Sequence, residues 1–340
     1  MSRDGDLLSP SRFTRGGGAG AEIGDQVADD KVLTEFVSGA TLVLQGVHRT
    51  WAPVRTFAEG LSAQLGHPVQ VNAYVTPPQN TGFAPHYDVH DVFVLQFAGR
   101  KRWLVHEPVL PAPLRDQTWQ QRKSAVDARA SETPLIDCVL ERGDVLYLPR
   151  GYIHSAMSLD DISGHLTIGV HPVTRRMLAD QILSELSDDV ALRRSLPIGV
   201  DLSDEDAIEA DLAATVAALH AAIDRFDRTA IARALGRYLA ASTRPVAIRP
   251  FEQIAASGKL TPSDRVRLRP GLRLTLQVDS EHVAVILPDR EIRFPASQAQ
   301  AVRLATSGRD ISAEKLPSTD SNDGLALLSQ LLRDGVVVPA

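Results

Sequence analysis

The sequence predicts an α+β protein in which a barrel or sandwich of antiparallel strands is followed by a helical region and a small helix-and-ribbon unit. Three observations lead to this prediction. Short apolar runs separated by turn residues fill residues 1–175, leucines at helical spacing fill 176–243, and a strongly alternating segment flanked by helical patterns fills 244–340. We take these three ranges as the predicted domains of the 340-residue chain.

The first range contains the apolar runs expected of such a barrel or sandwich. Each run is short and separated from the next by turn residues. A glycine-rich segment at residues 16–20 has no strand before it and no Gly-Lys-Ser/Thr after it, so we interpret it as a loop rather than a phosphate-binding site. The predicted strands are Ala40–Leu44, Val69–Val75, Val92–Phe97, Trp103–Val105, Val145–Leu148 and Leu166–Val170.

The second range is predicted to be helical. Leucine and isoleucine recur at intervals of three and four residues between Leu178 and Leu186, and a similar apolar spacing runs from Leu212 to Ile223. Ser203, with Asp206 three residues later, resembles a capping box that opens the second of these helices. No pattern in this range indicates catalysis.

The third range predicts a small unit of helices and a β-ribbon. Apolar and polar residues alternate over 266–278, a turn follows at 279–281, and 283–287 returns as the second strand of a hairpin. Helical patterns at 299–306 and 325–332 flank this hairpin. The unit resembles a winged helix, a fold that binds DNA in some proteins and protein partners in others, so the fold alone does not decide its role.

Composition excludes several kinds of site and partner. With 36 basic and 42 acidic residues, the net charge of −6 lacks the broad basic footprint of a nucleic-acid binder, so we do not expect specific DNA binding. The single cysteine, Cys138, excludes intrachain disulfides and cysteine-rich metal sites, so any metal must be held by His, Asp or Glu. The first residues lack the apolar stretch of a secretion signal and no apolar run approaches about 18 residues, so we expect a cytoplasmic protein without a membrane span.

Two segments that contain histidine and aspartate predict a metal site. His86 and Asp88 are two residues apart, so on an extended backbone both side chains leave the same face. A Gly-Asp turn at 143–144 leads into a strand and then to His154, which is placed to complete the site across the barrel. Two imidazoles and one carboxylate leave three open positions on a metal, the arrangement of non-haem Fe(II) oxygenases, whereas catalytic zinc usually keeps one open position.

A buried lysine is predicted next to this site. After a tight turn at Gly99 we expect the chain to run back as a hairpin, on which Lys101 shares a face with Trp103. A buried ammonium is costly without an anion, and a bound dicarboxylic acid would supply one. A straight hairpin would place Lys101 about 26 Å from Asp88, so we expect the chain to bend near His90.

Several spaced segments together resemble the JmjC-domain 2-oxoglutarate oxygenases, and within them they are most similar to the ribosomal oxygenase group. The order of barrel, helical region and small C-terminal unit resembles that group too. Family members usually carry a further N-terminal stretch, so we expect either that Met1 is not the natural start or that this member is trimmed. The segments that carry the resemblance are residues 72–78, 82–88, 93–96, 99–103, 143–154 and 165–167.

This resemblance implies a fold and a set of roles. The fold is a double-stranded β-helix (cupin or jelly-roll) barrel, followed by a helical dimerisation region and a winged helix. Lys101 would pair with the far carboxylate of 2-oxoglutarate. The implied Fe(II) ligands are His86, Asp88 and His154, and the residues that would line the cosubstrate pocket are Asn72, Tyr74 and Thr167. The histidines without a spacing argument, which we interpret as core or surface residues, are His90, His106, His165 and His171.

The function implied is that of a 2-oxoglutarate- and Fe(II)-dependent oxygenase. It would use O₂ to hydroxylate a protein side chain, an arginine or histidine of a ribosomal protein, and convert 2-oxoglutarate to succinate and CO₂. Such a protein would be a homodimer. Two alternatives stay open: a small-molecule hydroxylase on the same core, and a non-catalytic metal-binding cupin that acts as a regulatory or interaction module.

Overall fold

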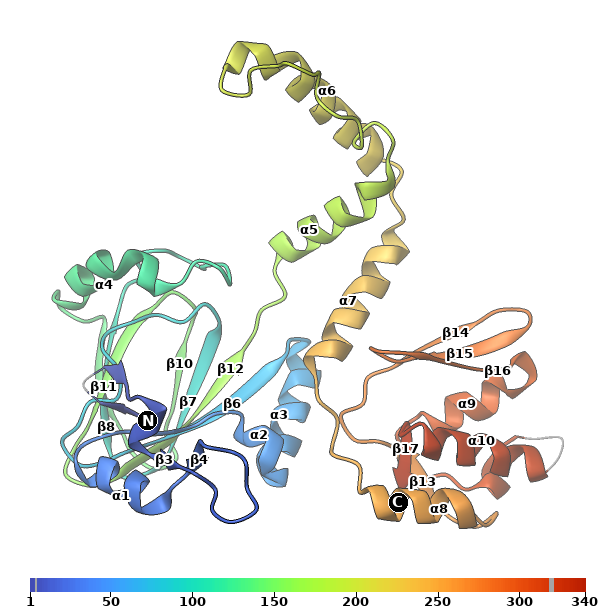
Figure 1. Cartoon of the computed structure of the whole chain (residues 1–340), viewed down its shortest axis with the longest axis horizontal. Coiled ribbons are helices and arrows are strands. Elements are labelled where there is room, and N and C mark those ends of the chain that lie inside the picture. The colour runs from blue at the N-terminus through green and yellow to red at the C-terminus, as the bar shows by residue number, and fades with distance from the viewer. Residues whose placement is uncertain (4, 318–320) are drawn as a thin grey trace. The chain divides into compact units, whose positions relative to one another are not determined.

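The computed structural model describes residues 1–3, 5–317 and 321–340, which divide into two compact units, Met1–Pro172 and Val173–Ala340. Figure 1 shows strands concentrated in the first unit and helices with a small β-ribbon in the second. Among the described residues, no helix is both long and apolar enough to cross a membrane.

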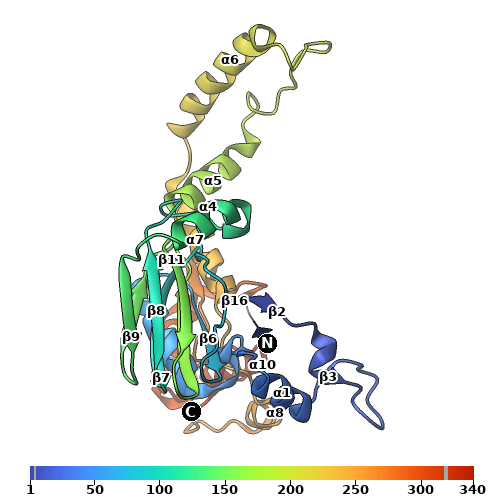
Figure 2. The ribbon, with the colours of Figure 1, turned by 90° about the vertical axis from the view of Figure 1, so that its left-hand side faces the viewer.

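The first unit is built from two antiparallel sheets that share one core. A five-stranded sheet has the order β10-β7-β12-β6-β5, and a three-stranded sheet has the order β11-β8-β9; Figure 2 shows β9, β8 and β11 side by side. Val92 and Val94 of the larger sheet pack with Trp103 and Val105 of the smaller one. The strands are β5 (Leu42–Leu44), β6 (Val69–Thr76), β7 (Asp91–Ala98), β8 (Lys101–His106), β9 (Ile136–Leu140), β10 (Val145–Leu148), β11 (Ile153–Ser158) and β12 (Ser163–Val170).

All six predicted strands are present, and the two barrel sheets contain two further strands that the sequence does not predict. Alternation is clearest in β7, where Val92, Val94 and Gln96 are buried and their neighbours are more exposed. β9 and β11 are the unpredicted strands. β11 mixes serine, alanine and methionine, so it lacks the apolar run by which strands are recognised.

The predicted hairpin of β7 and β8 is wrong. β7 pairs with β12 and β10, whereas β8 pairs with β9 and β11, so the chain crosses from one sheet to the other at Gly99 and Arg100. Gly99 has φ +59°, and a Cβ there would lie 2.2 Å from the carbonyl oxygen of Ile162, so the crossing requires glycine. The predicted bend is present: the chain bends at Val89 and His90, just before β7, and Asp88 and Lys101 line the same cavity.

Helices and an insertion close the outside of the barrel. Val54 and Ala58 of α3 (Ala52–Leu65) pack on Val71 of β6, and α2 (Val47–Thr50) lies beside them. Between β8 and β9 an insertion carries the short helix η2 (Trp119–Arg122) and α4 (Lys123–Ala130), which lies at one end of the strands (Figure 1). Val126 of α4 packs against Tyr87 and Ile153, which are neighbours of the predicted metal ligands in sequence.

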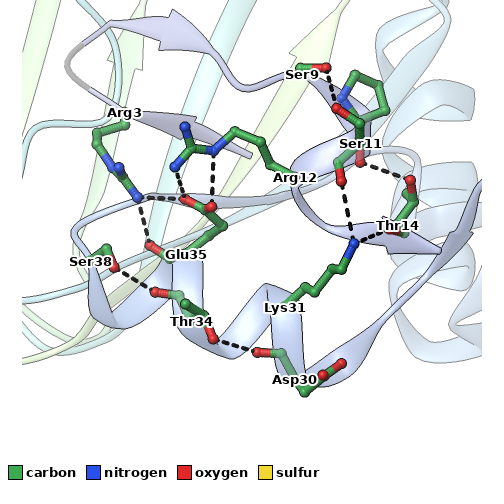
Figure 3. A network of polar contacts seen from close by, with 11 residues as sticks. Arg3, Ser9, Ser11, Arg12, Thr14, Asp30, Lys31, Thr34, Glu35 and Ser38 are labelled. Atoms are coloured by element: carbon green, nitrogen blue, oxygen red, sulfur yellow. Dashed lines mark hydrogen bonds and ion pairs between the residues drawn. The ribbon is translucent and has the colours of Figure 1, made fainter.

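A carboxylate clamp attaches the N-terminal arm to the barrel (Figure 3). Glu35 of α1 (Asp29–Val37) accepts hydrogen bonds from Arg3 at 2.6 Å and from Arg12 at 2.9 Å. Ser2 then pairs through its backbone with Thr41. The short elements of the arm are β1 (Ser2–Arg3), β2 (Asp6–Leu7), η1 (Pro10–Arg12), β3 (Thr14–Arg15) and β4 (Gln26–Val27).

The second unit begins with a helical segment, as the sequence predicts, in which α7 is a helix beyond the two predicted stretches. α5 (Arg175–Glu185) is followed by η3 (Leu186–Asp188), α6 (Glu205–Ile223) and α7 (Arg228–Ser242). The predicted capping box is wrong: the N-cap of α6 is Asp204, whose carboxylate accepts from the backbone N–H of Asp206, while Ser203 donates to Asp201.

The rest of the second unit has its own apolar core. The predicted strand over 266–278 is split, because Pro270 and Gly271 end β13, which pairs with β17, and β14 then pairs with β15. The winged-helix assignment stays a prediction. The elements are α8 (Pro250–Lys259), β13 (Val266–Leu268), β14 (Thr275–Val278), β15 (His282–Ile286), β16 (Glu291–Pro295), η4 (Ala296–Gln298), α9 (Ala299–Ala305), η5 (Ala313–Lys315), α10 (Ser321–Arg333) and β17 (Val337–Pro339).

The clamp predicts a specific loss of stability. Glu35→Gln keeps the shape of the side chain but removes the charge that two arginines share, so we expect the free energy of unfolding in urea to fall by about 1–2 kcal/mol. The matched control is Glu132→Gln, which removes an exposed partner 3.6 Å from Arg129 and should cost about 0.5 kcal/mol or less. Equal losses in the two variants would show that the clamp does not stabilise the arm.

Candidate metal centre and adjoining cavity

Two histidines from distant segments are paired directly through their backbones. His86, in the loop before β7, and His154, in β11, form an antiparallel bridge in which His86 N–H donates to His154 at 3.2 Å and His154 N–H donates to His86 at 2.8 Å. Side chains of directly opposed residues leave the same side of such a bridge, and the two imidazole centroids lie 4.5 Å apart. His86 and Asp88 are therefore placed by one bridge rather than by the regular strand that the sequence suggests.

Asp88 joins the two histidines to form a compact set of ligand atoms. One nitrogen of each imidazole and one oxygen of the carboxylate lie within 4.8 Å of one another, and His154 Nε2 is 3.7 Å from Asp88 Oδ2. Each imidazole Nδ1 hydrogen-bonds a carbonyl two residues earlier, Ala84 at 2.8 Å for His86 and Tyr152 at 3.1 Å for His154. These bonds fix the ring orientations and leave each Nε2 lone pair for a metal.

Burial and neighbouring charges shift the pKa values of two of these side chains, His154 and Asp88. Burial, together with the nearby His86, lowers the pKa of His154 to about 4, so its imidazole is neutral at pH 7. Burial disfavours the ionised form of Asp88, but the charges of His154 and His86 outweigh burial and hold its pKa below the ordinary value. A neutral His154 imidazole and an ionised Asp88 carboxylate are the forms that bind a divalent cation.

The segments that carry the three side chains are tied together beyond the bridge. Gly151 N–H donates to the carbonyl of Asp88 at 3.0 Å, and Arg150 N–H donates to the Asp91 carboxylate at 2.9 Å. Gly151 has φ +92°, and a Cβ there would lie 2.6 Å from the carbonyl oxygen of Leu110. The Pro-Arg-Gly turn before His154 thus has a structural reason for its glycine.

A cavity of about 340 Å³ adjoins the three side chains, a volume in the range of small-molecule sites. Two predicted pocket residues, Tyr74 and Thr167, lie in its wall, and so does Lys101. The wall consists of Gly5, Leu7, Tyr74, Gly82, Phe83, Ala84, His86, Asp88, Val92, Val94, Lys101, Trp103, Trp119, Gln120, His154, Ser155, Ala156, His165 and Thr167.

Lys101 is a buried cation without an anionic partner. Its side chain is 2% exposed, and Nζ donates to Thr76 Oγ1 at 3.0 Å. Within residues 1–3, 5–317 and 321–340, no carboxylate lies within 4 Å of this ammonium. Burial lowers the pKa of Lys101 to about 8. The site therefore favours a ligand that brings a negative charge to this end of the cavity.

Two of the predicted pocket residues, Asn72 and Tyr74, are on β6, and only Tyr74 lies in the cavity wall. Tyr74 lies in the cavity wall, and burial, with the charge of Asp88, raises its pKa to about 12, so the phenol stays a hydrogen-bond donor. Asn72 lies outside the wall. Its Oδ1 accepts from the Gly46 N–H at 2.9 Å and from Gln70 Nε2 at 3.1 Å. Asn72 also acts on the pKa of Tyr74, the neighbouring residue of the cavity wall.

Sequence reasoning misses one histidine of the cavity wall. His165 is interpreted as a core or surface residue, but it is buried in the wall and stacks on Tyr74 with 5.0 Å between ring centroids. The signal that could have found it is strand alternation, because His165 is two residues from Thr167 on β12. His90 and His171 instead stack on each other at 4.7 Å.

The segment that holds this site matches a known domain. Residues 49–178 match the family model described as the JmjC domain, and this range contains the two histidines, Asp88 and Lys101. Residues 49–178 form a JmjC domain. The resemblance on which the sequence interpretation depends is thereby confirmed over the barrel strands β6 to β12.

Curated relatives of this domain are longer proteins. Over 137 residues the chain is 38% identical to the bifunctional lysine-specific demethylase and histidyl-hydroxylase NO66 of Drosophila yakuba, which covers 38% of this chain and 20% of that protein. Over 169 residues it is 37% identical to ribosomal oxygenase 1 of Homo sapiens, which covers 48% of this chain and 26% of that protein. The match thus spans a fifth to about a quarter of these relatives.

Solved structures with a similar fold include the ribosomal oxygenase YcfD of Escherichia coli. Its crystal structure aligns with a TM-score of 0.50 and 18% identity, over 88% of this chain and 78% of that chain. A second structure is of YcfD in complex with cobalt and succinic acid, with a TM-score of 0.50 and 18% identity, over 87% of this chain and 77% of that chain. At this identity the likeness concerns the fold, and it confirms the predicted cupin-type JmjC barrel.

The isolation of Lys101 predicts that its removal stabilises the ligand-free protein. Lys101→Met keeps the volume and removes a buried charge, so we expect the free energy of unfolding at pH 7 to rise by about 3 kcal/mol, the equivalent of a pKa lowered from 10.5 to about 8. Between pH 8 and 10.5 the unfolded wild-type chain binds more protons than the folded one, so wild-type stability rises with pH across that window. The difference between the two proteins should therefore disappear by about pH 10.5.

Urea denaturation at several pH values measures this difference. Lys123→Met is the control, because Lys123 is exposed beside Asp127 and its removal should leave the pH profile unchanged. A Lys101→Met protein less stable than wild type at pH 7 would contradict the absence of an anionic partner.

Proposed function

We propose that this protein is a 2-oxoglutarate- and Fe(II)-dependent oxygenase that hydroxylates a protein side chain. One observation carries the proposal: a two-histidine, one-carboxylate set and a buried lysine without an anion line the same small cavity. The first feature suits a redox-active divalent metal, and the second suits a dicarboxylic acid that reaches the metal with its other end.

The donor set fits iron(II). Its three atoms would come from His86, Asp88 and His154, and the lowered pKa values of Asp88 and His154 favour the forms that bind a metal. A bound iron(II) would supply the activation of O₂, coupled to conversion of 2-oxoglutarate to succinate and CO₂. The same set accepts zinc or manganese, so the choice of metal depends on availability as well as on the ligands.

The remaining residues of the cavity would position the cosubstrate. Lys101 Nζ, already oriented by Thr76, would neutralise the far carboxylate. Tyr74 and Thr167 offer hydroxyl donors on the adjoining strands β6 and β12. Val92 and Val94 form an apolar part of the wall, which limits water near the reacting groups and strengthens the charge pairing at Lys101.

We propose a ribosomal protein as the substrate, hydroxylated on an arginine or histidine. The relatives named ribosomal oxygenase and histidyl-hydroxylase support this choice, and the YcfD complex supports a dicarboxylate beside a metal in this fold. A small-molecule hydroxylase and a non-catalytic metal-binding module are the alternatives. Consumption of 2-oxoglutarate with Fe(II) would exclude the non-catalytic module, and mass spectrometry of ribosomal proteins after incubation distinguishes the two enzymes.

Two substitutions should separate cosubstrate binding from metal binding. Lys101→Ala leaves the far carboxylate unpaired, so we expect the Kd of 2-oxoglutarate to rise by about two to four decades while metal affinity barely changes. Asp88→Ala removes one of three ligands, so we expect metal binding and 2-oxoglutarate turnover to be lost together. Calorimetry with manganese and succinate release with Fe(II) measure the two properties.

The matched control for Lys101→Ala is Arg100→Ala. Arg100 is the preceding residue, exposed and paired with Asp160 outside the cavity. It should leave both affinities unchanged. Wild-type affinity for 2-oxoglutarate in Lys101→Ala, or turnover in Asp88→Ala with added Fe(II), would overturn the assignment.

We also propose that the protein is a homodimer through its helical region. Helix α6 exposes large apolar side chains along its length, including Leu212, Val216 and Ile223, and Leu183 of α5 is exposed as well. An exposed helix with so apolar a surface gains stability when a partner covers it. A second copy offers the same apolar surface for a symmetric interface.

Light scattering tests the dimer. At micromolar concentration we expect about twice the 36.8 kDa chain mass for wild type and a large shift toward monomer for a Leu212→Glu, Val216→Glu double variant. Ile254→Glu is the control, since Ile254 is exposed on α8 outside these helices and its change should leave the dimer intact. A wild-type mass near that of one chain would disprove the proposal.

A further inference from the structure

His165 lies in the cavity wall, where it packs against two aromatic side chains. Its ring is nearly parallel to Tyr74, at 5.0 Å and 4°, and meets Trp103 edge-on at 5.4 Å and 81°. Lys101 and His154 line the same cavity as this ring, and the charges of both act on it. A ring packed against two aromatic neighbours presents its nitrogens in fixed directions.

The surroundings of the ring also determine where its proton lies. Burial, followed by the charge of Lys101, holds the pKa of His165 well below 6.5, so the imidazole is neutral and carries one N–H. Nδ1 is enclosed and has no hydrogen-bond partner among the described residues. A buried N–H without an acceptor loses a hydrogen bond that water would have supplied, so the proton belongs on Nε2, from which it can reach a ligand in the cavity.

The strand register brings His165 close to the partner of Lys101. β12 pairs with β6 so that His165 is opposite Tyr74, and Ser163 is opposite Thr76. Thr76, which accepts from Lys101 Nζ at 3.0 Å, is thus a diagonal neighbour of His165 on the inner face. Diagonal neighbours in an antiparallel pair lie within reach of long and aromatic side chains.

We propose that His165 is a further cosubstrate-binding residue, whose neutral Nε2–H donates a hydrogen bond to the carboxylate that Lys101 neutralises. The inference rests on the proposed function. A carboxylate has two oxygens, and the ammonium together with a fixed neutral donor would satisfy both. The neutral donor adds directionality that an ammonium on a flexible chain does not have.

A matched pair of ligands tests this role. His165→Phe keeps the stacked ring and removes the donor, and binding is measured by calorimetry on anaerobic, manganese-loaded protein. We expect the Kd of 2-oxoglutarate to rise about tenfold or more, as for the loss of a hydrogen bond to a charged group. Oxalate binds metals through two adjacent oxygens and has no far carboxylate, so its Kd should change by less than about twofold. His165→Gln, which restores an N–H donor, should recover part of the affinity for 2-oxoglutarate.

Each outcome decides one statement. Unchanged 2-oxoglutarate affinity in His165→Phe, or equal weakening of 2-oxoglutarate and oxalate, would overturn the proposed hydrogen bond and leave His165 as a packing residue. Failure of the wild-type protein to bind 2-oxoglutarate with manganese would instead overturn the proposed function. Manganese affinity and the thermal midpoint of His165→Phe, compared with wild type, show whether the variant is folded. If it is not, the His165→Gln result decides: a partial loss of affinity for 2-oxoglutarate alone supports the donor, and equal affinity changes for both ligands, or none, contradict it.

Discussion

Two backbone hydrogen bonds hold the candidate metal centre together. They join His86, which lies in a loop, to His154, which lies in a strand paired with β8 along its length. A hydrogen-bonded antiparallel pair fixes the separation of its Cα atoms at about 5.5 Å, so the two imidazoles face one point whatever the loop does elsewhere. The bond from Gly151 to the carbonyl of Asp88 extends this registry to the third side chain. The site is thus positioned by backbone pairing, and the side chains need only short-range bonds to orient their rings.

The barrel tolerates a cation where an apolar residue would be more stable. Lys101 is almost fully enclosed and has a threonine hydroxyl as its polar partner, so burial on folding disfavours its charged form and lowers the stability of the fold. The same isolation makes the site selective, because an arriving carboxylate gains a pairing that the protein does not already supply. In a JmjC domain this is an exchange of stability for binding, localised to one residue of β8. Tyr74 and His165, stacked on each other, form part of the wall of the same cavity.

Local patterns predict much of this molecule, and distant contacts decide the rest. The alternation in β7 and the two-residue spacing of His86 and Asp88 are local, so the sequence contains them. The link at Gly99 is compatible with a hairpin or with a crossing, and the choice is made by the carbonyl of Ile162, some sixty residues away in the chain. Asn72 shares a strand face with Tyr74, but the N–H of Gly46, from another segment, engages its oxygen. His165 is missed because a lone histidine in an apolar run looks the same whether it fills a core or lines a cavity.

The insertion between β8 and β9 touches the site from outside the barrel. Val126 packs on Tyr87 and Ile153, the Tyr87 hydroxyl donates to the carbonyl of Gln117 at 2.9 Å, and Trp119 lies in the cavity wall. Tyr87 sits between two of the candidate ligands in the chain, so the insertion and the metal site share a residue. Loops in this position are where related barrels can diversify, since their length and composition are not bound by the sheet register. Here such divergence has a limit, because a changed insertion keeps the metal site intact only if it still packs on Tyr87. The residues of the insertion that contact Tyr87 are therefore constrained together with the barrel, whereas the rest of the insertion is free to acquire new partners.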